Sequence, residues 1–270
     1  MLDTAIEAAN EAGKLLRKSF GSTLNVNQAT HHDIKLEMDE LSQKLITRII
    51  LADYPDHAIL GEEGVSGSED ADVRWVIDPL DGTVNYFYGI PHYAVSIAAQ
   101  VRQSLEPGRP DKNVGAPFWQ TVAGVVLAPE LDELFATEKG QPSTLNGRPI
   151  HVSDRERLDE AIVSIGFFKS EETIRRGLHD FAFLIPRVRK MRLMGAAALD
   201  VAYVACGRFD AYIEYGVKLW DIAAGQLILE NAGGRVQSQP SQDGPQAFEV
   251  RMWNGKVPLN QPSSIGVTAV

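Results

Sequence analysis

The fold is decided by a stretch in which an apolar strand runs into an acidic turn, Ile77-Asp78-Pro79-Leu80-Asp81-Gly82-Thr83. The apolar residues before it predict a strand that delivers Asp78 at its carboxyl end. Pro79 stiffens the exit from the strand, and Gly82 permits a tight turn or the close approach of a ligand. Asp78 and Asp81 are three residues apart, so both carboxylates and the backbone carbonyls between them can face one point. Hard oxygen ligands of this kind suit Mg²⁺, although Asp and Gly also form ordinary turns.

Two further acidic positions follow the same pattern. Glu62 and Glu63 come directly after a short apolar run at residues 58–60, and Asp221 follows Trp220 at the start of an apolar stretch. Taken singly, the two glutamates are typical of a solvated turn. Asp221 is typical of a helix N-cap, whose second oxygen can still bind a metal. Three acidic sites at strand ends or helix starts favour a cation site more than any one of them does.

The N-terminal part of the chain predicts two helices followed by strands. Apolar residues at helical spacing predict a helix over 4–20, with a capping box of Thr4 and Glu7, and a helix over 34–51, with Asp39 on its more polar side. Short apolar runs between turn residues predict strands at 58–60, 74–77, 93–101, 122–127 and 133–137. Residues 104–120, rich in Pro, Gly and charge, predict a surface excursion.

Strands and helices alternate after about residue 158. We expect strands at 161–165 and 209–215, helices at 171–184, 199–205 and 221–231, and an edge strand at 248–253 within a weakly patterned tail that begins at Ser238. The chain therefore predicts an α/β protein with two subdomains. Residues 1–157 would form an α+β N-terminal subdomain that carries most of the metal ligands, and residues 158–270 an α/β C-terminal subdomain that completes the site.

The composition excludes some classes of function. The 270 residues carry a formal net charge of −10, with 44% hydrophobic and 23% charged residues. The negative charge argues against a general binder of nucleic acids or anionic membranes, because both surfaces require clustered Lys and Arg. No apolar stretch approaches the roughly 18 residues of a membrane span, and the N-terminus lacks the basic start of a signal peptide. We therefore expect a cytoplasmic protein with no nucleic-acid or membrane partner.

Three segments, taken in this order and spacing, resemble the signatures of the inositol monophosphatase family: Gly61-Glu62-Glu63, residues 78–86, and residues 220–225. The resemblance runs from Ala5 to about Val236 and includes the segment from Gly195 to Asp200. Members of this family are metal-dependent, typically lithium-sensitive phosphatases. The resemblance implies a layered α-β-α-β-α sandwich of the inositol monophosphatase and fructose-1,6-bisphosphatase type. It also implies a homodimer with roughly two or three Mg²⁺ ions in each active site.

Carried over position by position, the resemblance implies a binuclear metal site. The first Mg²⁺ would be held by Glu62, Asp78 and the carbonyl of Leu80. The second would be held by Asp78, Asp81 and Asp221. Bound metal would lower the pKa of a water, neutralise phosphate oxygens and stabilise the leaving oxygen of an in-line displacement.

The resemblance also assigns catalytic and substrate-binding roles. Asp39 and Thr83 would orient the attacking water, with Glu63 supporting the site nearby. Since Thr83 cannot act as a strong base, a hydrogen bond to Asp39 would position it. The substrate would contact Gly82, Thr83, Gly195, Ala196, Ala197 and Glu214. We therefore predict a Mg²⁺-dependent phosphomonoesterase that hydrolyses inositol monophosphate or a similar small sugar or cyclitol phosphate.

Other functions remain open at this point. A fructose-1,6-bisphosphatase or a histidinol-phosphate phosphatase of the same superfamily would use the same metal ligands. A 3′-phosphoadenosine phosphatase is less favoured, because Val84-Asn85-Tyr86 matches the inositol-type ending of the motif. A catalytically silent scaffold is opposed by the complete set of acids. Ala196 stands where many members carry Ser or Thr, a departure that concerns the substrate rather than the metals.

Overall fold

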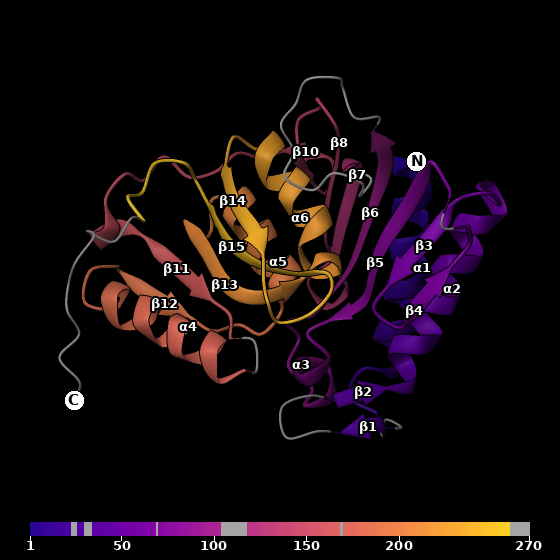
Figure 1. Ribbon diagram of the computed structural model, residues 1–270, viewed down its shortest axis with the longest axis horizontal. Coiled ribbons are helices and arrows are strands. Elements are labelled where there is room, and N and C mark those ends of the chain that lie inside the picture. The colour runs from indigo at the N-terminus through magenta and orange to yellow at the C-terminus, as the bar shows by residue number, and fades with distance from the viewer. Residues whose placement is uncertain (23–25, 30–33, 69, 104–117, 168–169, 260–270) are drawn as a thin grey trace.

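The computed structural model, shown in Figure 1, is a stack of five layers in which helices alternate with sheets. It describes residues 1–22, 26–29, 34–68, 70–103, 118–167 and 170–259. The layers, in order, are α1 (Leu2–Ser19) with α2 (Glu37–Asp53), an eight-stranded sheet, α5 (Ala197–Ala205) with α6 (Leu219–Asn231), a five-stranded sheet, and α4 (Glu171–Leu184). The predicted α/β class and its α-β-α-β-α layering are therefore confirmed.

The eight-stranded sheet comes from the N-terminal half of the chain. Its strands, in spatial order, are β10 (Arg148–Pro149), β9 (Thr144–Leu145), β8 (Glu133–Glu138), β7 (Phe118–Ala128), β6 (Ala94–Gln103), β5 (Val73–Asp81), β3 (Ala58–Gly61) and β4 (Gly64–Ser66). Neighbouring strands are antiparallel except β3 and β5, which run parallel with Gly61 opposite Ile77. Because parallel strands end at the same edge of a sheet, Glu62 and Asp78 lie side by side.

The α1 and α2 helices cover the outer face of this sheet. The face that α1 buries is rich in alanine, namely Ala5, Ala8, Ala9 and Ala12, so the helix axis can lie close to β6 and β7. Beneath the helices, Trp75, Ile77 and Ile97 are completely buried. Apolar burial of this kind contributes roughly 25 cal/mol for each Å² removed from water, and it is what holds the layers together.

The α5 and α6 helices are apolar on nearly all sides, because each is packed between the two sheets. In α6 the buried residues run without interruption from Ile222 to Gly225 and from Leu227 to Leu229. Close contact between α6 and β7 depends on glycine, since a Cβ on Gly124 would lie 2.9 Å from the backbone oxygen of Ala224. This contact places the first turn of α6, which carries Asp221, against the eight-stranded sheet.

The five-stranded sheet has the spatial order β12 (Lys190–Arg192), β11 (Ile162–Ile165), β13 (Ala211–Lys218), β15 (Ala247–Trp253) and β14 (Arg235–Pro240). β11 runs parallel to β12 and β13, whereas β15 is antiparallel to both of its neighbours. The α4 helix covers the outer face of this sheet. The smaller elements are β1 (Val26–Ala29), β2 (Ile34–Leu36), α3 (Thr83–Phe87) and two 3₁₀ turns, Pro129–Leu131 and Leu158–Glu160.

The predicted start of the first helix is wrong. α1 begins at Leu2, two residues before the predicted Thr4. The Thr4 hydroxyl donates to Asp53 at the end of α2, with an oxygen–oxygen distance of 2.8 Å, and forms no capping box with Glu7. The hydroxyl therefore links two helices instead of ending one.

The predicted start of the second helix is also wrong. α2 begins at Glu37, because Ile34–Leu36 pairs with Val26–Ala29 as a short strand. Asp39 consequently lies in the first turn of α2. Its side chain is 2% exposed, so the prediction that it lies on the polar side of the helix is wrong. Its carboxylate accepts a hydrogen bond from the backbone NH of Leu36, so it caps the helix from within.

The C-terminal strands differ from the prediction in one respect. β15 contains the predicted strand 248–253, but it lies between β13 and β14 and is not an edge strand. The edge is formed by β14, which includes Ser238 from the segment expected to be weakly patterned. The other predicted strands and helices are present, with ends shifted by a few residues.

Two further expectations concern segments between elements. Residues 118–120 of the predicted excursion belong to β7, and residues 104–117 lie outside the described residues. The first large sheet ends at Pro149 and the second begins at Ile162, so a subdomain boundary at residue 157 falls between them and stays a prediction. Within the described ranges, no helix is both long and apolar enough to cross a membrane.

Candidate active site

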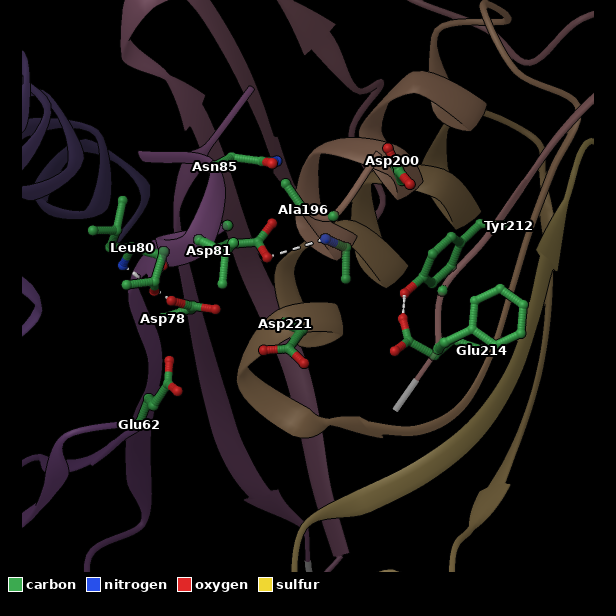
Figure 2. A pocket seen from close by; sticks show the side chains of 17 residues that line it. Glu62, Asp78, Leu80, Asp81, Asn85, Ala196, Asp200, Tyr212, Glu214 and Asp221 are labelled. Atoms are coloured by element: carbon green, nitrogen blue, oxygen red, sulfur yellow. Dashed lines mark hydrogen bonds between the residues drawn. The ribbon is translucent and has the colours of Figure 1, made fainter. Parts of the chain in front are cut away.

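A cavity of about 340 Å³ opens where the end of β5 meets the starts of α5 and α6 and the middle of β13. It brings together most of the predicted site residues: Glu62, Asp78, Leu80, Asp81, Gly82, Thr83, Gly195, Ala196, Ala197, Glu214 and Asp221. Figure 2 shows the acidic side chains Glu62, Asp78, Asp81 and Asp221 on one side and Glu214 on the other. Asp39 and Glu63 do not line the cavity.

The turn that carries Asp78 and Asp81 is held by its own backbone. Asp78 and Asp81 pair with Ser96 and Ala94 of β6, and the register shifts between them, so the irregularity of the ladder falls on Pro79 and Leu80. The Asp78 carboxylate accepts from the Leu80 NH at 3.0 Å. Gly82 follows with φ of 86°, in the left-handed region that suits glycine. A Cβ there would also lie 3.1 Å from the Cβ of Ala196, so the turn and the start of α5 can meet closely only without a side chain.

Asp81 joins the N-terminal and C-terminal parts of the chain. Its two carboxylate oxygens accept from the backbone NH groups of Ala197 and Ala198 at 3.0 and 2.8 Å. These NH groups are the unpaired donors at the start of α5, where the helix dipole also favours a negative charge. The predicted residues Asp81 and Ala197 are thus in direct contact although 116 positions separate them.

Asp221 lies in the first turn of α6 and was predicted to be its N-cap. The N-cap is Lys218, and Asp221 is three positions further on, where its carboxylate accepts from the Lys218 NH at 2.9 Å. One oxygen of Asp221 is therefore used by the helix start, and the side chain points toward the cavity (Figure 2).

The carboxylates in the cavity repel one another. Burial raises the pKa of Asp78 well above its usual 3.8, and the neighbouring charges of Glu62, Asp81 and Asp221 raise it further. Asp78 and Asp221 are close enough to share a hydrogen bond when one of them is protonated. Burial and the charge of Asp221 likewise raise the pKa of Asp81, against the opposing effect of the Ala197 and Ala198 amides. Buried like charges of this kind are stabilised by a cation.

The donor set fits Mg²⁺ better than a softer metal. The groups that face the cavity here are carboxylate oxygens and the Leu80 carbonyl, with no thiolate or imidazole from the predicted set. Over the described residues, no three His, Cys, Asp or Glu side chains are grouped so that they could hold a metal ion by themselves. Asp81 and Asp221 are each also engaged by backbone amides. A site completed by water and substrate phosphate is the usual arrangement for Mg²⁺.

Thr83 and Asp39 form the predicted pair. The Thr83 hydroxyl lies 3.0 Å from a carboxylate oxygen of Asp39 and 3.0 Å from the carbonyl oxygen of Leu80. Burial of Asp39 raises its pKa to about 6, despite the hydrogen bonds from Leu36 and Thr83 that favour the charged form. Asp39 therefore does not line the cavity itself. It contacts the hydroxyl of Thr83, which does.

Glu63 is placed differently from the other predicted acids. Its backbone NH donates to the Gln43 side chain at 2.9 Å, and the residue lines a groove between α2 and β4 instead of the main cavity. The charge of Glu63 nevertheless contributes to the raised pKa of Asp39. A catalytic role for Glu63 remains a prediction.

Several residues of the cavity were not assigned from the sequence: Asn85, Gly166, Phe167, Asp200 and Tyr212. Tyr212 could have been found, because residues two apart on a strand share a face and Glu214 was already assigned. The Asn85 amide donates to the backbone oxygens of both His92 and Met194 at 2.8 Å, which ties α3 to the loop before Gly195. No local pattern reveals this contact, since Met194 is 109 positions away.

Comparison with known proteins identifies the family. The sequence pattern of the inositol monophosphatase family matches residues 1–109 and 119–255. The Nus factor SuhB of Pseudomonas aeruginosa is 40% identical over 244 residues, covering 87% of this chain and 84% of that protein. The Nus factor SuhB of Escherichia coli K12 is 37% identical over 240 residues, with the same coverage of 87% and 84%.

Solved structures agree with this result. The inositol monophosphatase from Anabaena has a TM-score of 0.75 at 35% identity, covering 94% of this chain and 90% of that one. The extragenic suppressor protein SuhB from Bartonella henselae has a TM-score of 0.79 at 31% identity and covers 92% of both chains. On the strength of the matched pattern, the sequence identity and the shared fold, this chain belongs to the inositol monophosphatase family.

Proposed function

We propose that this protein is a Mg²⁺-dependent phosphomonoesterase acting on inositol monophosphate or a similar small sugar or cyclitol phosphate. The observation that carries the proposal is the cavity in which Asp78 and Asp221, from opposite parts of the chain, come within hydrogen-bonding reach. Membership of the family supports a phosphatase. A cytoplasmic homodimer and sensitivity to lithium are part of the same proposal.

Magnesium would be held by the side chains of Glu62, Asp78, Asp81 and Asp221 and by the carbonyl of Leu80. Once bound, it would supply the positive charge that neutralises phosphate oxygens and makes a water acidic enough to attack. The Gly82–Thr83 segment would contact the phosphate, and the Gly195–Ala197 turn and Glu214 would contact the remainder of the substrate.

The protein itself would orient the attacking water. The Thr83 hydroxyl has one proton and two acceptors within 3.0 Å, the Asp39 carboxylate and the Leu80 carbonyl. With its proton directed at either acceptor, the Thr83 oxygen can accept a hydrogen bond from water on the cavity side. The lone pair of that water then points at phosphorus for an in-line attack, and no covalent phosphoenzyme is required.

A panel of phosphate esters tests the proposal. We expect Mg²⁺-dependent phosphate release that EDTA abolishes, with the highest kcat/KM for inositol 1-phosphate among inositol 1-phosphate, fructose 1,6-bisphosphate, histidinol phosphate and a nucleoside 3′-phosphate. Hydrolysis that persists without divalent metal, or none across the panel, would contradict the proposal. A higher kcat/KM for fructose 1,6-bisphosphate or histidinol phosphate would instead assign the alternative substrate considered from the sequence.

A second candidate function is that of a Nus factor. The observation in its favour is that the relatives at 40% and 37% identity are named Nus factor SuhB. A formal net charge of −10 disfavours unaided binding to nucleic acid, so we propose that such a role would depend on protein contacts. The complete set of acids gives no reason to regard the two functions as exclusive.

Complementation separates the second function from the first. We expect this chain to reverse the phenotype of a Pseudomonas aeruginosa strain that lacks its SuhB, and the Asp81→Asn variant to do so equally well if the Nus role needs no phosphatase activity. Expression is checked by immunoblotting. Failure of both proteins at normal expression would rule out the Nus function for this chain, and success of the wild type alone would tie it to catalysis.

A further inference from the structure

Tyr212 and Glu214 form a pair at the end of the cavity opposite Glu62 (Figure 2). Both residues belong to β13 and, being two positions apart, they project from the same face of the strand. The Tyr212 hydroxyl donates a short hydrogen bond to an oxygen of the Glu214 carboxylate, Oε2. Glu214 is proposed to contact the substrate, whereas Tyr212 has no assigned role.

The place of the same carboxylate oxygen depends on the lack of a side chain at Gly166. A Cβ placed on Gly166 would lie 1.9 Å from Oε2 of Glu214 and 2.4 Å from its Cδ. The Glu214 carboxylate therefore occupies the space that any side chain at position 166 would take. Gly166 is itself fixed to β13, because its backbone NH donates to the oxygen of Ile213 at 2.9 Å. Glycine is thus required by the position of the carboxylate.

The Tyr212 hydroxyl is a hydrogen-bond donor to a carboxylate and remains protonated. Its side chain is 1% exposed, and burial together with the Glu214 charge raises the pKa of the phenol well above 10. The phenol therefore keeps its proton at neutral pH and can donate it to Glu214. Tyr212 is anchored by its packing among the buried residues of α5 and α6, so the donor cannot follow Glu214 if the carboxylate moves.

We propose that Tyr212 holds the Glu214 carboxylate, in the space that Gly166 leaves open, in one orientation for accepting hydrogen bonds from hydroxyl groups of the substrate's alcohol part. Tyr212 is then a positioning residue that determines selectivity for polyol phosphates over hydroxyl-free phosphate esters. The inference rests on the proposed phosphatase function. It follows from the general rule that a recognition group discriminates most strongly when it is already oriented before the substrate binds.

Substrate selectivity provides the test. We expect Tyr212→Phe to lower kcat/KM for inositol 1-phosphate, relative to kcat/KM for phenyl phosphate, by about tenfold, the effect of losing one hydrogen bond to a charged group. The loss should lie in KM. Tyr215→Phe is the matched control, because Tyr215 lies on the same strand but donates to Asp180 on α4, at 2.6 Å. That control should leave the ratio unchanged.

Gly166→Ala gives an independent test of the same geometry. Its Cβ displaces the Glu214 carboxylate, so the ratio of the two kcat/KM values should fall as in Tyr212→Phe, and the double variant should fall no further than either. A Gly166→Ala protein that does not fold leaves Tyr212→Phe decisive by itself. An active wild type with an unchanged ratio in Tyr212→Phe would overturn this inference alone. A wild type that hydrolyses neither ester would overturn the proposed function and this inference with it.

Discussion

Replacement of Asp78 by Asn is expected to lower kcat/KM for phosphate-ester hydrolysis about a thousandfold, the scale of losing electrostatic stabilisation of a transition state. Asp78 is the predicted ligand common to both metal ions, and it is the acid that feels the charges of all three of its neighbours, Glu62, Asp81 and Asp221. An amide can replace one coordinating oxygen but not the negative charge. Steady-state kinetics over a range of Mg²⁺ concentrations measures the loss and shows whether added metal restores any of it.

The same substitution is expected to stabilise the metal-free protein. The oxygen of the introduced amide can still accept from the Leu80 NH, and its NH₂ group can donate to Asp221, while one buried charge disappears. In a protein of this size, each kcal/mol gained raises Tm by roughly 2–4 °C. Asp81→Asn is the matched control. It removes a charge from the same cavity, but its NH₂ group faces one of the two backbone NH groups that Asp81 accepts from, so one hydrogen bond is lost. The Tm of this variant should therefore rise less than that of Asp78→Asn, or fall.

The pH dependence of stability follows from the same charges. A carboxyl group whose pKa is raised in the folded state binds its proton more tightly there than in the unfolded chain. Its contribution to stability is therefore complete below the usual value of 3.8 and is lost as pH rises through the folded pKa. The Tm of the metal-free wild type, in EDTA, should fall with rising pH, and less steeply in Asp78→Asn. Equal slopes, or a metal-free Asp78→Asn protein less stable than wild type, would contradict mutual repulsion as the dominant effect.

The second large effect is expected at the Asp39–Thr83 pair. Asp39→Asn and Thr83→Ala should each lower kcat/KM about a hundredfold, the usual scale for a positioned proton-transfer group. Because Asp39 acts on the cavity through the Thr83 hydroxyl, the double variant should lose no more than the single ones. Additive losses would show that the two side chains act separately.

The pair also predicts how activity depends on pH. Charged Asp39 is the better acceptor for the Thr83 proton, and the pKa of Asp39 is raised to about 6, so kcat/KM should rise as pH increases through about 6. The contribution of Asp39 to the free energy of unfolding changes with pH in the direction opposite to activity. It is complete below pH 3.8 and is lost as pH rises through about 6. The value of about 6 belongs to the metal-free protein, and bound Mg²⁺ favours the charged carboxylate, so the inflection in the loaded enzyme should lie at or below it. In Asp39→Asn the inflection of kcat/KM should be absent.

Ser42→Ala serves as the control for this pair. Ser42 is also buried on α2 and donates to the carbonyl of Pro79 on the same turn, at 2.9 Å, but it does not contact Thr83. We expect it to lower the free energy of unfolding by about 1 kcal/mol while keeping the inflection near pH 6. An inflection that survives in Asp39→Asn would assign the titration to another group.

Local patterns in the sequence were sufficient for most of the elements and for the acids that line the cavity. Strand-ending runs such as the one before Asp78 depend on neighbouring residues only, so periodicity and turn residues reveal them. The errors arose where pairing or packing with another segment overrides the preference that the residue spacing suggests. Residues 34–36 have an apolar spacing that extends the helix pattern, yet they pair with Val26–Ala29 as a strand. The predicted edge strand at 248–253 is central, because sheet order is set by packing and not by sequence order.

By itself, the sequence determined which side chains we propose for binding a cation and phosphate, and at which strand ends and helix starts they lie. Only the tertiary structure decided that the turn holding Asp78 meets the first turn of α6, that Asp39 is buried next to Thr83, and that Tyr212 bonds Glu214 in the space left by Gly166. The physical reason is the distance along the chain over which each interaction acts. Backbone propensity and side-chain periodicity act over a few residues, whereas burial, charge repulsion and close contact depend on how the five layers pack.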